Sequence, residues 1–94
     1  MSKPVSWLGS NKTLKAPKGT TEEQVQDLPI FTNGKVCVSC WQLSEEALKE
    51  VINTGCIFLS IYSGSTQPPV FMGSQEEVRA VAVDYGPVWK ISNV

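Results

Sequence analysis

The chain has 94 residues, of which 41% are hydrophobic, and a formal net charge of −1. This length accommodates one domain with a small core, and the apolar content excludes a disordered chain. The near-neutral charge excludes a general nucleic-acid binder, because such domains normally carry a basic excess.

The N-terminal segment is rich in lysine, proline and glycine and contains no acidic residue before Glu22. We expect residues 1–19 to form an irregular basic arm and residues 20–94 to form a single α+β domain. Trp7 is the expected anchor of the arm on the domain. In one interpretation Lys18 contacts an anionic ligand or an acidic partner, and in the other the arm is a solvated tail.

Two local patterns follow the arm. The segment Thr20-Thr21-Glu22-Glu23 has the capping-box spacing, which predicts a short helix from Thr21 to about Asp27. Asn33-Gly34 then separates two β-prone runs, residues 30–32 and 35–39, and this predicts a hairpin. We expect a type I′ turn, because Asn-Gly accepts the positive φ that both central residues of that turn require.

Residues 44–54 carry the pattern of the main amphipathic helix. Ser44 is a suitable N-cap, the following glutamates complement the helix dipole, and Gly55 is suited to end the helix. Apolar residues recur at helical spacing between these two ends. We therefore predict an antiparallel β-sheet with this helix packed on one of its faces.

Strict alternation of apolar and semi-polar residues from Cys56 to Tyr62 predicts a strand. The segment from Ser63 to Pro69 predicts a loop whose two prolines hold its exit stiff and extended. Beyond Met72 two patterns compete, since Ser74-Gln75-Glu76-Glu77 favours a helix through about Val83 and the valines favour strands. We favour one helical turn followed by strands.

The chain contains no histidine, which removes the commonest general base and the commonest metal ligand. Cys37, Cys40 and Cys56 have three interpretations: buried thiols, a metal site that lacks a fourth ligand, and a redox pair. We expect buried thiols, no cofactor, no metal and no catalytic activity. An enzyme with Cys40 or Cys56 as nucleophile remains a third functional class.

Polar and aromatic groups on conformationally fixed loops and strand ends are typical of binding sites. On this basis we predict a ligand-binding or partner-binding site, with Trp41 open to a second interpretation as a core residue and the loop open to a purely solubilising role. The candidate residues are Lys18, Trp41, Tyr62, Ser65, Thr66, Gln67 and Arg79.

No apolar run in the sequence is long enough to span a bilayer, and the N-terminus lacks the apolar core of a signal peptide. An odd number of cysteines without such a signal favours a reducing compartment. We therefore expect a cytoplasmic protein that binds neither nucleic acid nor membrane.

Three blocks carry a resemblance to a known group: Leu14-Lys15-Ala16-Pro17-Lys18-Gly19, Leu28-Pro29-Ile30, and the stretch from Trp41 to Val70. Together they resemble small uncharacterised accessory proteins of tailed bacteriophages. The likeness covers residues 14–70, with Ala47 where that pattern has Glu. It implies a product of the infected cell's cytoplasm and carries over no activity.

These expectations lead to two functional hypotheses. The first is a small, self-associating, non-catalytic binding module that sequesters a small anionic, nucleotide-like signal or blocks a host defence protein. The alternative is a virion structural or assembly protein that pairs with a neighbouring subunit through an edge strand.

Overall fold

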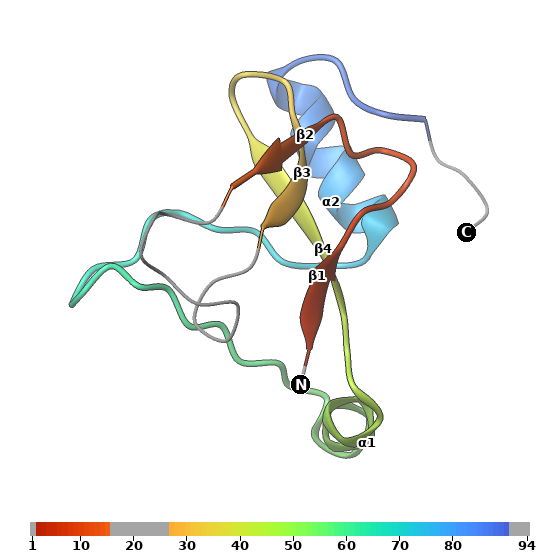
Figure 1. Cartoon of the computed structure of the whole chain (residues 1–94), viewed down its shortest axis with the longest axis vertical. Coiled ribbons are helices and arrows are strands. Elements are labelled where there is room, and N and C mark those ends of the chain that lie inside the picture. The colour runs from red at the N-terminus through yellow and green to blue at the C-terminus, as the bar shows by residue number, and fades with distance from the viewer. Residues whose placement is uncertain (1, 16–26, 91–94) are drawn as a thin grey trace.

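The structure, a computed structural model, describes residues 2–15 and 27–90 (Figure 1). Four antiparallel strands form one sheet in the order β1-β4-β3-β2. The strands are β1 (Lys3–Val5), β2 (Lys12–Leu14), β3 (Leu28–Thr32) and β4 (Cys37–Gln42). The helices are α1 (Glu45–Thr54), α2 (Gln75–Ala82) and the short 3-10 turn η1 (Val83–Tyr85). The α+β class predicted from the sequence is confirmed.

Strand β4 holds the sheet together because its two halves pair with different strands. Its first half pairs with β3, with Phe31 opposite Val38. Its second half pairs with β1, with Val5 opposite Cys40. Strand β2 adds to the other edge of β3. The prediction of an irregular arm over residues 1–19 is therefore wrong for β1 and β2, because pairing with distant strands orders both segments.

The hairpin between β3 and β4 is confirmed, but its turn differs from the expected one. Only Gly34, with φ of 88°, has a positive φ in this turn, whereas Asn33 does not. The Asn33 side chain bends the chain instead, since its Oδ1 accepts from the backbone N–H groups of Lys35 and Val36, each at 3.1 Å. This side-chain turn replaces the type I′ geometry.

Helix α1 has the predicted ends: Ser44 accepts from the Ala47 N–H, and Gly55 closes the helix with φ of 68°. Its position differs from the prediction, because α1 buries none of its residues and Ile52 is 71% exposed. The helix lies beyond the end of the sheet rather than on a face (Figure 1).

The predicted strand from Cys56 to Tyr62 does not form; the segment is irregular and mostly exposed. The favoured pattern after Met72 is also wrong, because the competing pattern forms a full helix, α2. Its Ser74 accepts from the Glu77 N–H while Glu77 accepts from the Ser74 N–H, which completes the capping box. Residues 88–90 form no strand. The predicted helix over residues 21–27 lies outside the described residues, apart from Asp27, which is not helical.

The core is small and lies where β3, α2 and the C-terminal segment meet. Its apolar members among the described residues are Ile30, Phe31, Ala82 and Trp89, each at most 9% exposed. Trp41, in contrast, is 53% exposed and is not a core residue. Trp89 has the largest ring in the core and also lines the candidate site.

Candidate functional site

Trp89 is the centre of an aromatic cluster assembled from three distant parts of the chain. Its ring lies 4.8 Å from that of Phe31 on β3, centroid to centroid, at a tilt of 59°. Trp7 meets it edge-on, with centroids 5.8 Å apart and planes at 82°. Edge-on and tilted pairs of this kind are the favoured aromatic arrangements. The predicted role of Trp7 as the anchor of the N-terminal segment is thus confirmed.

Helix α2 holds Trp89 in position through residues on one of its faces. The Gln75 side-chain oxygen accepts from the Trp89 Nε1–H at 3.0 Å. One turn later, the Arg79 Nε–H donates to the Trp89 backbone carbonyl. Residues four apart on a helix share a face, so Gln75 and Arg79 act together on the same segment. The indole N–H is satisfied by the helix, and the ring is left to contact aromatic neighbours.

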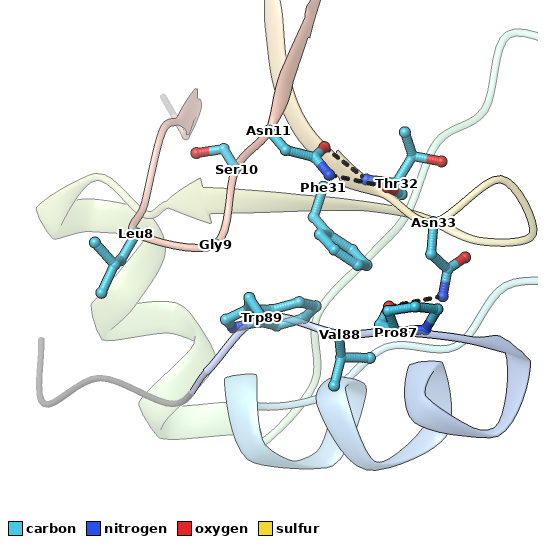
Figure 2. A pocket seen from close by; sticks show the side chains of 10 residues that line it. All are labelled: Leu8, Gly9, Ser10, Asn11, Phe31, Thr32, Asn33, Pro87, Val88 and Trp89. Atoms are coloured by element: carbon cyan, nitrogen blue, oxygen red, sulfur yellow. Dashed lines mark hydrogen bonds between the residues drawn. The ribbon is translucent and has the colours of Figure 1, made fainter.

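An open pocket of about 390 Å³ lies in front of this cluster (Figure 2). Its volume falls within the usual range for small-ligand sites. Phe31 and Trp89 supply an aromatic wall, with the Phe31 ring directed towards Trp89. The other lining residues are Leu8, Gly9, Ser10, Asn11, Thr32, Asn33, Pro87 and Val88.

Two asparagines hold the edges of the pocket together, as the dashed lines in Figure 2 show. Asn11 donates from Nδ2 to the Thr32 carbonyl and accepts at Oδ1 from the Thr32 N–H, both at 2.9 Å. Asn33 donates from Nδ2 to the Pro87 carbonyl at 3.2 Å. Because these amides are already bonded within the protein, they shape the pocket more than they offer free groups to a ligand.

No charged side chain is among the residues that line the pocket. Three exposed lysines nevertheless lie one or two positions from lining residues: Lys12 follows Asn11, Lys35 follows the Asn33-Gly34 turn, and Lys90 follows Trp89. No acidic residue lies as close in sequence to these lining segments. The pocket thus has an uncharged, largely apolar lining, in which Phe31 and Trp89 are 6% and 9% exposed, and exposed lysines follow its lining segments in the sequence.

The residues predicted from the sequence do not gather at this pocket. Tyr62 is 96% exposed and belongs, with Ser65, Thr66 and Gln67, to an exposed loop. That loop is closed by a hydrogen bond of 3.1 Å from the Thr66 hydroxyl to the Ser63 carbonyl. Trp41 lies on β4, where its Nε1–H donates to the Ser39 hydroxyl at 2.8 Å.

Of the remaining predicted residues, Arg79 does not line the pocket. It contacts the lining residue Trp89 by donating to its backbone carbonyl. Lys18 lies outside the described residues. The pocket residues Phe31, Trp89 and Asn11 were not predicted as site residues. An aromatic residue two positions after Pro87 was a usable signal for Trp89, whereas nothing local marks Asn11 as a partner of Thr32.

The expectation of buried thiols is wrong, because Cys37 and Cys56 are exposed and Cys40 is only partly buried. Removal of water by neighbouring atoms raises the pKa of Cys37 above its usual value, and the positive charge of Lys12 opposes this in part. A raised pKa keeps the thiol protonated at neutral pH, which lowers its nucleophilicity. The described part of the chain also contains no cluster of three or more Cys, Asp or Glu side chains placed to hold a metal ion.

Comparison with known proteins finds no matching family model, no matching curated protein and no matching solved structure. Within residues 2–15 and 27–90, neither helix has the length and apolar character needed to cross a bilayer. The function is therefore argued from the geometry of the pocket.

Proposed function

We propose that the protein is a small non-catalytic binding module that holds a ring-bearing, nucleotide-type ligand in the pocket beside Trp89. The observation that carries this proposal is the open, uncharged cavity of about 390 Å³, whose lining includes the nearly buried Phe31 and Trp89. A nucleobase has two flat faces and gains about 1–3 kcal/mol from stacking on an aromatic side chain.

The charge around the pocket supports an anionic ligand with an uncharged ring. The lining itself carries no charge, so it suits the base, and the exposed Lys12, Lys35 and Lys90, one or two positions from lining residues, are the candidates to attract a phosphate. The resemblance to phage accessory proteins supports a role in sequestering such a signal in an infected bacterium. The same binding module is alternatively proposed to block a host defence protein instead of sequestering a nucleotide-type signal.

The test is titration with adenosine, AMP and inorganic phosphate, monitored by tryptophan fluorescence and calorimetry. We expect AMP to bind and to quench fluorescence, adenosine to bind more weakly, and phosphate alone to leave the spectrum unchanged. Cyclic nucleotides and ADP-ribose extend the series. Absence of a saturable signal with every nucleotide would overturn the proposed ligand class.

A matched pair of variants locates the site. Leu8 lines the pocket and is 73% exposed, so Leu8→Glu changes the rim without touching the core. Its negative charge repels a phosphate, and we expect AMP affinity to fall at least about tenfold. Val70→Glu introduces the same charge at a 54% exposed residue outside the pocket and is expected to bind normally. Equal losses in both variants would contradict binding at this pocket.

A second candidate function, assembly through strand pairing, is favoured by a different observation. The segment that was expected to be a strand, from Cys56 to Tyr62, is exposed and has no strand partner in the structure. An exposed β-prone segment is a template for pairing with another chain. Finding the protein in purified virus particles would support that function, and early expression without incorporation would contradict it.

A further inference from the structure

Most of the backbone of segment Ile57–Ile61 has no hydrogen-bond partner among the described residues. The bonds at its borders are those of Cys56 with the Thr54 hydroxyl and of the Ser63 N–H with the Ile61 carbonyl. Between them, five N–H groups donate to no described group. Backbone groups in β-prone segments are normally paired, so this segment is available to a partner strand.

The side chains of this segment are as exposed as its backbone. Phe58 is 89% exposed, and Ile57 and Leu59 are 51% and 46% exposed. The preceding helix α1 adds Leu48 and Ile52, which are 47% and 71% exposed on its apolar stripe. Exposed apolar residues concentrated in one stretch of the chain indicate an interaction site.

The charge pattern of the segment fits a second copy of the same chain. No charged residue occurs from Asn53 through Gln75, so two copies of this stretch meet without like-charge repulsion. The segment is also self-complementary. When two copies run antiparallel about a two-fold axis at Leu59, Ile57 of one copy lies opposite Ile61 of the other, and the three alternate apolar residues of both copies share one face.

We propose that the chain forms a two-fold symmetric dimer in which Ile57–Ile61 of two copies pair as antiparallel strands centred on Leu59. The pairing supplies partners for the unbonded backbone and buries the apolar side chains that the monomer exposes. It also gives the apolar stripe of α1 a surface to cover, which the sheet does not provide. The interface lies outside the pocket and does not depend on the ligand proposed there.

The test uses the symmetry of the pairing, because a residue on the axis meets its own copy. Leu59→Asp places two carboxylates opposite each other, and Leu59→Lys places two ammonium groups there. We expect wild type to be a dimer by light scattering and native mass spectrometry, and each variant to dissociate at least about tenfold more readily. An equimolar mixture of the two variants is expected to form a heterodimer, since Asp then faces Lys.

The controls separate folding, interface and function. Val70→Asp and Val70→Lys carry the same charges at an exposed residue outside the segment and should remain dimeric. Unchanged tryptophan fluorescence verifies that the Leu59 variants keep a folded core, and their AMP titration tests the pocket separately. A monomeric wild type would contradict dimer formation. A Leu59→Asp variant that remains dimeric would contradict the proposed interface. Failure of the two variants to associate when mixed would contradict the two-fold register centred on Leu59.

Discussion

Gly9 shows how closely the aromatic cluster is packed around a single residue. It is buried, and a Cβ at this position would lie 2.5 Å from Trp89 Cγ and 2.6 Å from Trp7 Nε1. Both atoms belong to rigid rings, which cannot move aside as the end of a flexible side chain can. Glycine is required here by close approach, and the backbone conformation plays no part in the requirement.

We therefore predict that Gly9→Ala destabilises the protein by about 1–3 kcal/mol, the usual effect of overpacking. Urea unfolding followed by fluorescence measures the change. Ser6→Ala, at a nearby exposed residue, is the control and should leave the unfolding midpoint in place. A Gly9→Ala protein as stable as wild type would show that the rings are free to separate.

Glu77 links the stability of α2 to pH. The Ser74 backbone N–H donates to Glu77 Oε1 at 2.9 Å, and this bond, with a smaller contribution from the Ser74 side chain, lowers the pKa of the Glu77 carboxyl. A carboxyl whose pKa is lower in the folded state stabilises the fold above its unfolded pKa. That contribution is lost as the pH falls through the folded-state pKa.

Glu77→Gln removes the titration while keeping a side-chain acceptor for the capping box. We predict that wild type is more stable than Glu77→Gln at neutral pH and that this advantage shrinks on acidification to about pH 3. Thermal unfolding at both pH values measures the difference. Glu76→Gln, in the same turn without the capping bond, should show a smaller change, and a constant difference for Glu77→Gln would contradict the linkage.

At the scale of elements, the two helices have similar caps and different roles. Ser44 and Ser74 each accept from a backbone N–H at 3.2 Å, those of Ala47 and Glu77. Helix α2 buries Ala82 and positions Trp89, whereas α1 buries none of its residues. A helix of ten residues that buries no side chain is only marginally stable, so α1 depends on its caps and α2 depends on the core.

The same substitution in the two caps is therefore expected to have different results. Ser74→Ala should lower the free energy of global unfolding by about 1 kcal/mol, seen as a shift in the urea midpoint of tryptophan fluorescence. Ser44→Ala should reduce the helical circular dichroism signal and leave that midpoint nearly unchanged, because α1 opens locally. Equal shifts in the midpoint would show that α1 and the core unfold as one unit.

At the scale of the whole molecule, the chain buries few large side chains for its length. Four apolar residues form the buried core of the described part, while Phe58, Ile52 and Tyr62 remain largely exposed. Burial of apolar surface is the main favourable term in folding, so stability has to come in part from further contacts. Self-association through Ile57–Ile61 is the source that we propose.

Stability should accordingly depend on protein concentration. If only folded chains dimerise, each tenfold rise in concentration above the dissociation constant stabilises the fold by up to about 1.4 kcal/mol per mole of dimer. Urea midpoints measured over two decades of concentration should therefore rise for wild type and stay constant for Leu59→Asp. A wild-type midpoint independent of concentration would contradict stabilisation by association.

The sequence by itself determined the features that depend on neighbouring residues. The caps at Ser44, Gly55 and Ser74 lie where their patterns predicted, because each cap bonds to a backbone group within one helical turn. Asn33-Gly34 likewise marked the hairpin, although the geometry of its turn depended on the Asn33 side chain. Trp7 was also recognisable as an anchor in a polar segment.

Only the tertiary structure decided which segments became strands and where the pocket lies. Residues 12–14 pair with β3, whereas the more strongly patterned Cys56–Tyr62 segment has no strand partner within residues 2–15 and 27–90. A strand forms only when a second strand pairs with it. Whether the fold places such a partner beside a given segment cannot be read from the local sequence pattern. The pocket likewise requires Asn11, Phe31 and Trp89 to meet from three distant segments, and only packing of the chain around Trp89 brings them together.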